Sequence, residues 1–165
     1  MTDTSAADSF LIRLDAVSAR FASHAAETPS DHALTAPDPS SGERWDSGQV
    51  WAHCAEFVPY WIEQARIVIG SYEGEPVPFG RTKVDEGRIT AIERDRRQPV
   101  AVLWSETHSG IERLRHMLAA LDSAAWDTRG LHPSLGVMRM ERVVEEFLVG
   151  HLEQHADQLD EVARA

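Results

Sequence analysis

The sequence predicts an all-α fold, a four-helix bundle with a long connection between its second and third helices. Four stretches of about twenty residues repeat their apolar side chains at steps of three and four, which is the spacing of one helix face. No stretch alternates apolar and polar residues in the manner of a strand. With 165 residues, 42% of them hydrophobic, the chain is long enough for one buried core, and we expect a single domain over residues 1–165.

The first helix is expected from about Ala6 to Glu27. Thr28-Pro29 ends it, because proline lacks the backbone donor that would continue the ladder. A loop rich in Pro, Ser and Asp follows. The apolar stripe of this helix is Phe10, Leu14, Val17 and Phe21.

The second helix is expected to begin at Asp46, a good N-cap residue with Gln49 three positions on. Trp45, just before the cap, is placed to pack on Val50. The helix should run to about Ile69, with Gly70 as its terminator and a kink at Pro59. Its inward stripe is expected to be Val50, His53, Phe57, Tyr60, Gln64 and Ile67.

Residues 71–84 are expected to form a loop, followed by a short charged helix from about Asp85 to Arg97. Pro99 suits the first position of the third long helix, which should extend to about Asp122, with Gly110 as a weak point. The stripe of that helix is Leu103, Thr107, Ile111, Leu114, Leu118 and Leu121. The loop DTRGLHPSLGV then leads to a fourth helix over residues 140–163.

Two histidines interrupt the apolar stripe of the fourth helix. His151 and His155 lie four residues apart, so both face the side on which the leucines enter the core. A buried imidazole needs a partner for its ring nitrogens, because removing a polar group from water without one is costly. The full stripe is Val144, Leu148, His151, His155, Leu159 and Val162.

His53 occupies an inward position of the second helix, so three histidines are expected to meet inside one bundle. Three imidazoles on facing helices are a suitable ligand set for zinc, with a fourth position open to water or substrate in catalytic sites. Nickel, iron or manganese would also fit, since imidazole discriminates little between them. The alternative is that His151 and His155 are ordinary core-edge residues bonded to carboxylates or backbone. Leu152 follows His151, so the HExxH motif of zinc proteases is absent.

Two segments resemble the DinB/YfiT-like superfamily, which is associated with metal-dependent enzymes. They are RWDSGQVWAHCAEF (residues 44–57) and HPSLGVMRMERVVEEFLVGHLEQHADQLDEV (residues 132–162). The family shows an aromatic-led cap, a helix with the first metal histidine, and a late HxxxH helix followed by Gln-Leu. His53, His151 and His155 match those three histidine positions, whereas residues 71–98 are only loosely similar.

The resemblance implies a four-helix bundle, often dimeric, that binds a divalent metal such as zinc or nickel. Family members with assigned activities include thiol-dependent S-transferases and a mycothiol-dependent maleylpyruvate isomerase. We therefore expect a metal-dependent enzyme acting on a small molecule, through thiol S-transfer with a low-molecular-weight thiol as cosubstrate or through hydrolysis, and a homodimer. A non-catalytic, metal-stabilised binding or stress-response module is the alternative, and a helical dimer with three ordinary histidines is the simplest reading.

Glu56 and Cys54 lie close to His53 in the sequence, and we interpret each of them separately. Glu56, one turn on, is the candidate catalytic residue, as an acceptor that orients an imidazole or as a base. An exposed carboxylate is the alternative for it. Cys54 points about 100° away from His53 around the helix, so we expect a buried, inert thiol rather than a metal ligand or nucleophile.

Other polar residues are assigned to the surface or to the edge of the site. His108 is expected at a surface or rim position, and His132 at the mouth of the site. The acidic residues between 141 and 161 are expected to form a solvated face. Arg94, Arg96 and Arg97 should be solvated as well, or else attract an anionic cosubstrate.

Composition excludes several other classes of function. The net charge of −11 argues against binding to nucleic acid or to an anionic membrane surface. A single cysteine forms no internal disulfide, which fits a reducing cytoplasm. The polar N-terminus MTDTSAADSF lacks the pattern of a secretion signal, and no run has the length of a membrane span, so a cytoplasmic protein is expected.

Overall fold

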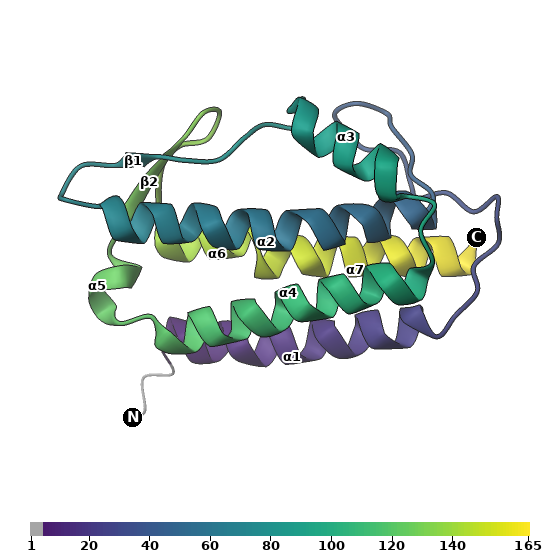
Figure 1. Ribbon diagram of the computed structural model, residues 1–165, viewed down its shortest axis with the longest axis horizontal. Coiled ribbons are helices and arrows are strands. Elements are labelled where there is room, and N and C mark those ends of the chain that lie inside the picture. Colours follow the sequence, from purple (N-terminus) through teal and green to yellow (C-terminus); the bar gives the residue numbers. More distant parts are fainter. Residues whose placement is uncertain (1–4) are drawn as a thin grey trace.

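The structure, a computed structural model, describes residues 5–165 and confirms the four-helix bundle (Figure 1). The long helices are α1 (Ala6–Ala25), α2 (Ser47–Ser71), α4 (Val100–Ala120), and a fourth that is divided into α6 (Met140–Phe147) and α7 (Val149–Arg164). Helices α4 and α7 each contact both α1 and α2. The two consecutive helices α1 and α2 therefore lie across the bundle from each other. Residues 1–4, with part of the polar N-terminus considered above, lie outside the described residues.

The predicted start of α2 is confirmed by a complete capping box. The Asp46 carboxylate accepts a hydrogen bond from the Gln49 backbone N–H at 2.8 Å, and the Gln49 side chain accepts one from the Asp46 backbone N–H at 3.0 Å. These bonds satisfy donors that the first helical turn leaves free. The cap fixes where α2 begins and hence the direction in which His53 points.

The predicted end and inner face of α2 were partly wrong. The helix continues through Gly70 to Ser71, and Gly70 does not take the left-handed conformation of a terminator. In the second half, Ile67 is exposed, and the buried residues are Trp61, Ile62, Ala65 and Val68. The predicted stripe moved off the buried face along the helix. Five turns take about 18 residues, so the residue that lies on the same face as Val50 is Val68 rather than Ile67.

Helix α4 confirms the third long helix, with Pro99 as its N-cap rather than its first helical residue. Its predicted stripe is buried from Leu103 to Leu118. A Cβ atom at Gly110 would come within 2.9 Å of the Val58 side chain of α2. Gly110 therefore serves the close approach of α2 and α4, a role that its helix propensity alone did not reveal.

The expectation that the chain contains no strand was wrong. Strand β1 (Val77–Pro78) pairs in parallel with β2 (Arg129–His132), which pairs antiparallel with β3 (Gly136–Arg139) in the order β1-β2-β3. Strands of two to four residues are too short to show a period-two pattern. The segment between α2 and α4 also contains α3 (Glu86–Asp95), which confirms the short charged helix, and α5 (Ser123–Trp126) precedes the hairpin.

The fourth helix is interrupted at Leu148, where the backbone takes φ −124° and ψ −89°. We expected one continuous helix here. A Cβ atom at residue 150 would lie 2.3 Å from the carbonyl oxygen of Glu145, so the interruption brings two chain segments too close for any side chain but glycine. The predicted inward stripe is nevertheless confirmed. His151 is half-buried, and the other members of the stripe are fully buried.

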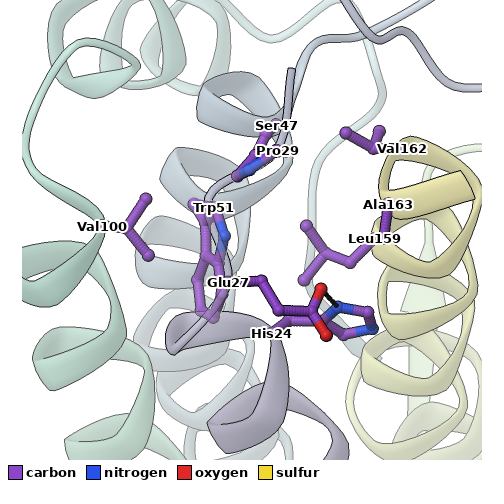
Figure 2. Close-up of a pocket in the computed structure, with 9 residues that line it drawn as sticks. All are labelled: His24, Glu27, Pro29, Ser47, Trp51, Val100, Leu159, Val162 and Ala163. Carbon is purple, nitrogen blue, oxygen red and sulfur yellow. Dashed lines mark hydrogen bonds and ion pairs between the residues drawn. The ribbon is translucent and has the colours of Figure 1, made fainter. Parts of the chain in front are cut away.

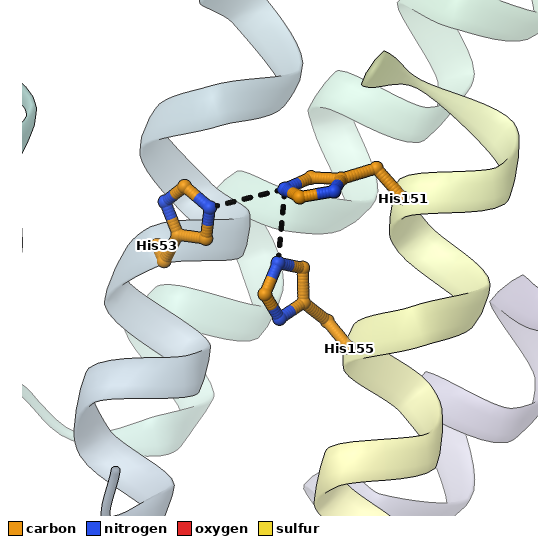
Figure 3. A group of neighbouring side chains, drawn as sticks. All are labelled: His53, His151 and His155. Carbon is orange, nitrogen blue, oxygen red and sulfur yellow. Dashed lines mark hydrogen bonds between the residues drawn. The ribbon is translucent and has the colours of Figure 1, made fainter. Parts of the chain in front are cut away.

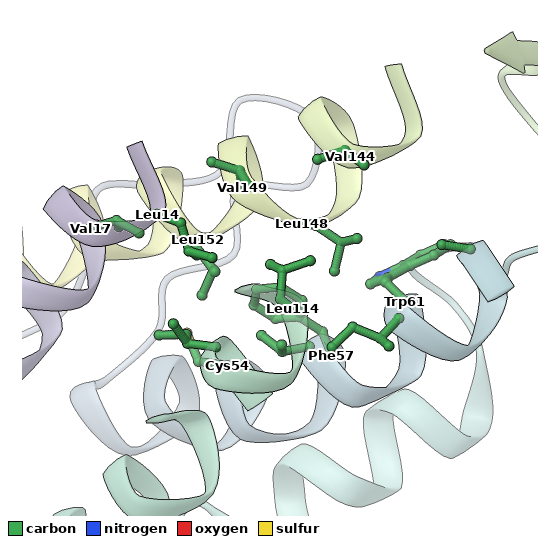
Figure 4. Packing of buried hydrophobic residues seen from close by; sticks show 14 of the residues in the cluster. Leu14, Val17, Cys54, Phe57, Trp61, Leu114, Val144, Leu148, Val149 and Leu152 are labelled. Atoms are coloured by element: carbon green, nitrogen blue, oxygen red, sulfur yellow. The ribbon is translucent and has the colours of Figure 1, made fainter. Parts of the chain in front are cut away.

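The hydrophobic core lies between the four helices (Figure 4). Cys54 and Phe57 of α2 face Leu114 of α4, and Leu148 and Leu152 approach from the fourth helix. Cys54 is fully buried, as expected. No helix within residues 5–165 is long and apolar enough to cross a membrane.

Candidate metal centre

The structure brings His53, His151 and His155 together between α2 and α7 (Figure 3). Nε2 of His151 lies 3.2 Å from Nε2 of His53 and 3.0 Å from Nε2 of His155. In a tetrahedral zinc site with bonds of about 2.0–2.1 Å, neighbouring ligand nitrogens are about 3.3 Å apart. Two of the three edges therefore have nearly the spacing of such a site, and the ligand atoms of all three residues lie within 4.8 Å of one another.

Burial keeps the three imidazoles neutral. His53 and His155 are 3% and 6% exposed, and His151 is half-buried. Burial, with the neighbouring positive charges, lowers the pKa of His53 and His151 well below 6.5 and that of His155 to about 4. At neutral pH each ring therefore has a lone pair for a cation.

Hydrogen bonding fixes which nitrogen of His155 carries the proton. Nδ1 of His155 lies 2.7 Å from Oε1 of Gln158, to which it donates. Nε2 then presents its lone pair to Nε2 of His151, which also faces Nε2 of His53. One N–H on His151 cannot satisfy both neighbours in full, whereas a shared cation can, so the donor set fits a metal ion.

His53 Nδ1 is the one buried side-chain nitrogen or oxygen without a hydrogen-bond partner among residues 5–165. Oε1 of Glu56 lies 3.6 Å from it. Metal-bound histidines typically donate their other N–H to a carboxylate, and a small movement would close this contact. The arrangement fits the orienting role expected for Glu56, and the alternative of an exposed carboxylate was wrong, since its side chain is 11% exposed.

Glu56 is itself held by Arg81, which donates to both carboxylate oxygens. Burial raises the pKa of Glu56, and the hydrogen bonds and charge of Arg81 oppose that shift. The Arg81 guanidinium also lies 3.8 Å from the centre of the Tyr60 ring. Glu56 therefore has a fixed position beside His53.

His132 reaches the site through the backbone of Arg81. Its Nε2 donates to the Arg81 carbonyl at 3.0 Å, and its Nδ1 accepts from the Leu135 backbone N–H at 3.2 Å. The ring is buried against Phe79 and Phe147. His132 was predicted at the mouth of the site. It instead forms a supporting contact between the hairpin and the Arg81 segment.

Aromatic rings surround the histidines. Trp45 stacks on His155 with ring centroids 6.2 Å apart and meets His53 edge-on at 5.4 Å. Phe57 contacts His151 at 4.6 Å. These rings displace water from the imidazoles, which explains the strong effect of burial on their pKa values.

The remaining sequence-based candidates are not part of the cluster. Burial raises the pKa of the Cys54 thiol, in agreement with an inert residue, and His108 is exposed as expected. Arg94 is exposed and pairs with Asp95, whereas Arg96 pairs with Asp46. The acidic face is not simply solvated, because Arg13 and Arg20 of α1 pair with four of its carboxylates, those of Glu145, Glu153, Asp157 and Asp160.

The sequence interpretation did not assign roles to Arg81, Arg88 or Gln158. Gln158 could have been found from its place three residues after His155 on the same helix face. Arg81 and Arg88 come from the connection between α2 and α4, and no local pattern shows that this segment folds back over the histidines.

A small cavity near the ends of α1 and α7 is distinct from the histidine cluster (Figure 2). Its volume of about 10 Å³ is enough for roughly one water molecule. His24, Glu27 and Trp51 contribute to its wall, and His24 pairs with Glu27 at 3.1 Å. It is too small for a substrate.

A helical bundle with a buried three-histidine cluster belongs to the class of helical proteins suited to binding a metal ion. The protein-family model described as the DinB superfamily matches residues 13–159, and the chain belongs to that superfamily. No curated protein sequence matches the chain significantly.

Comparison with solved structures agrees with this fold. YfiT from Bacillus subtilis, described as a probable metal-dependent hydrolase with an unusual four-helix bundle topology, aligns with a TM-score of 0.73 and 18% identity over 99% of this chain and 89% of its own. A mutant of the mycothiol-dependent maleylpyruvate isomerase aligns with a TM-score of 0.70 and 13% identity, over 95% of this chain and 62% of its own. An uncharacterized protein from Clostridium difficile 630 aligns at 0.58 with 10% identity, over 93% of each chain.

Proposed function

We propose that the protein is a metal-dependent enzyme that acts on a small molecule, with a zinc or nickel ion held by His53, His151 and His155. The observation that carries the proposal is the convergence of three neutral imidazoles through Nε2. Among residues 5–165, no cysteine, carboxylate or further histidine joins the group as a fourth ligand. Three protein ligands with a position left for water or substrate are typical of catalytic rather than structural zinc sites.

Side chains around the cluster have separate tasks in this proposal. Gln158 holds the tautomer of His155, and Glu56 is placed to receive the Nδ1 proton of His53 in a hydrogen bond. Trp45 and Phe57 keep water from the imidazoles. A divalent ion bound there would lower the pKa of a bound thiol or water at neutral pH and polarise an electrophile.

Thiol transfer is the first candidate reaction, with a low-molecular-weight thiol of the mycothiol kind as cosubstrate. The fold shared with the mycothiol-dependent isomerase supports it. Hydrolysis is the second candidate, supported by the likeness to YfiT, which is described as a probable hydrolase. Both reactions need an activated S–H or O–H group at the same place, so the same three histidines serve either one.

Metal analysis of the purified protein and of His53→Ala tests the proposal, with His108→Ala as a control that removes an exposed histidine. We expect about one zinc or nickel ion per chain in the protein and the control, and loss of the ion in His53→Ala. The loaded protein is then assayed with thiols plus electrophiles, and with esters and amides. Absence of metal after incubation with zinc and nickel would overturn the proposal, and bound metal without turnover would indicate a non-catalytic module.

The homodimer, the cytoplasmic location and the absence of nucleic-acid and membrane partners stay predictions. Sedimentation of the purified protein at micromolar concentrations would test the dimer directly. A single species with the mass of one chain, 18.4 kDa, would contradict it.

A further inference from the structure

Arg88 is a half-buried cation beside the histidine cluster that lacks a carboxylate partner. It lies in α3, three residues after the N-cap Asp85. Within residues 5–165 no aspartate or glutamate comes within ion-pair distance of its guanidinium, although Glu43, Glu56 and Asp85 act on it through space. Partly buried arginines are usually paired, because burying an unpaired charge is costly.

The position of Arg88 is fixed, and part of its binding capacity is free. Its Nη1 donates to the Lys83 carbonyl at 3.0 Å, and its guanidinium carbon lies 5.5 Å from the centre of the Trp45 ring. The other edge of the guanidinium, Nε–H and Nη2–H, has no hydrogen-bond partner among the described residues. That edge is the one with which arginine binds a carboxylate through two parallel hydrogen bonds.

Trp45 connects this cation with the candidate metal centre. The same indole that contacts Arg88 stacks on His155 and meets His53 edge-on. Arg88 and the imidazoles of His53 and His155 therefore contact the same aromatic ring. Arg81 differs, because it is neutralised by Glu56.

We propose that Arg88 binds a carboxylate of the ligand that occupies the three-histidine site. The substrates of this protein are then small molecules with a carboxylate close to the group that reacts. This proposal rests on the proposed metal-dependent function and adds the substrate class to it. The chain has a net charge of −11, so the rest of its surface repels anions. A fixed unpaired cation gives the site a local preference for them.

Two thiols that differ only in charge test the proposal. The protein is loaded with cobalt(II) in place of its metal, and the thiolate-to-cobalt absorption is titrated with 3-mercaptopropionate and with its neutral amide. We expect the carboxylate to bind about tenfold more tightly or better, the size of effect that a charge-assisted bidentate contact gives. In Arg88→Gln this preference should disappear, while the affinity for the amide should stay within about threefold.

Two further variants keep the test specific. Arg88→Lys should retain only part of the preference, because it keeps the charge without the two-pronged geometry. Arg94→Gln removes the same charge from an exposed position of the same helix, and it should behave like the unchanged protein. Unchanged cobalt spectra and thermal melting curves establish that each variant is folded.

The outcomes separate this proposal from the function on which it rests. Equal affinities for the two thiols, or a preference that survives in Arg88→Gln, would overturn the role of Arg88 and leave the metal site standing. A normal cobalt spectrum with no thiolate band from either thiol would overturn both this role and the thiol-transfer reaction. Failure to bind cobalt at all would overturn the proposed function itself.

Discussion

His53 uses its two ring nitrogens in different ways. Nε2 faces His151 at 3.2 Å, and Nδ1 is buried with no hydrogen-bond partner and has Glu56 at 3.6 Å. A cation at Nε2 withdraws electron density from the ring and makes Nδ1–H a stronger donor. The unsatisfied nitrogen and the buried carboxylate are therefore complementary, and a metal ion would make use of both.

Gln158 is predicted to support metal binding through His155. Replacement by leucine in Gln158→Leu removes the acceptor of the Nδ1 proton, which lies 2.7 Å away, and leaves the tautomer unfixed. We expect the affinity for zinc to fall by about 10–100-fold, the usual effect of losing such a supporting contact. Competition with a chelator of known affinity measures it. Gln158→Glu, which keeps an acceptor, should bind zinc at least as tightly as the unchanged protein, and equal losses in both variants would contradict the argument.

The lowered pKa values of the histidines predict how the stability of the metal-free protein depends on pH. The unfolded chain takes up protons near pH 6.5, whereas folded His155 does so only near its pKa of about 4. The free energy of unfolding is therefore fully retained above pH 6.5 and falls as the pH drops toward 4, by ~3 kcal/mol for His155 alone. Urea unfolding in EDTA at pH 7.5, 6 and 5 measures this.

The variant His155→Gln isolates the contribution of this residue from that of the carboxylates. It should show a shallower loss of stability than the unchanged protein between pH 6.5 and 5. Parallel pH profiles for the two proteins would mean that the buried imidazole does not control this range. The carboxylates with lowered pKa values, such as Glu145, lose their contribution only at more acidic pH.

The spacing of the histidines made the centre of the site predictable, but its surroundings were not. His151 and His155 share a helix, so their common face follows from helix geometry alone. His53 joins them because the cap at Asp46 and the apolar stripe orient α2 correctly. The position of Arg88 could not be predicted in this way, because its place beside Trp45 depends on how a long connection folds back.

At the level of elements, the small sheet supports one side of the site. The backbone of Phe79 donates to the carbonyl of Leu131, and His132 donates to the carbonyl of Arg81. The β2–β3 hairpin thus holds the segment from which Arg81 reaches Glu56. A feature that the sequence interpretation left as loop has a direct part in positioning the candidate catalytic carboxylate.

Gly80 is predicted to be essential to that support. It has φ +87°, and a Cβ atom there would lie 2.8 Å from the His132 ring and 3.0 Å from the Trp61 ring. We expect Gly80→Ala to lower the free energy of unfolding by about 2 kcal/mol or more, through backbone strain and steric conflict. Gly70→Ala is the matched control, because Gly70 is helical with open space around it, and it should stabilise the protein by about 0.5–1 kcal/mol. Similar effects of the two substitutions in urea unfolding would contradict this prediction.

The long helices were predictable because each combines a repeated apolar face with a recognisable beginning. The capping box at Asp46 and the stripe of α1 are examples. The strands were missed because pairing between Val77 and Gly130, far apart in the chain, defines them rather than any local pattern. The break at Leu148 was missed for a related reason. The apolar stripe continues through the break, and the feature that accompanies it, the close contact of Gly150 with Glu145, is visible only in the folded structure.

At the scale of the whole molecule, the candidate metal centre connects two helices that are distant in sequence. His53 belongs to α2, and His151 and His155 belong to α7. Arg13 and Arg20 of α1 pair with Glu153 and Asp157 of α7, but ion pairs of this partly exposed kind contribute little to stability. A bound ion would join α2 to α7 inside the bundle, where the contact is protected from solvent.

Metal binding is therefore predicted to stabilise the entire fold. A ligand that binds only the folded state at 1,000 times its dissociation constant adds about 4 kcal/mol to the free energy of unfolding. For a chain of this length we expect zinc to raise the melting temperature by about 8–16 °C over that in EDTA. In His53→Ala the ion loses its ligand from α2, so the increase should fall to a few degrees or less, whereas His108→Ala should keep it. The same increase in His53→Ala would mean that zinc stabilises the protein from another site, and that the histidines of α2 and α7 do not share an ion.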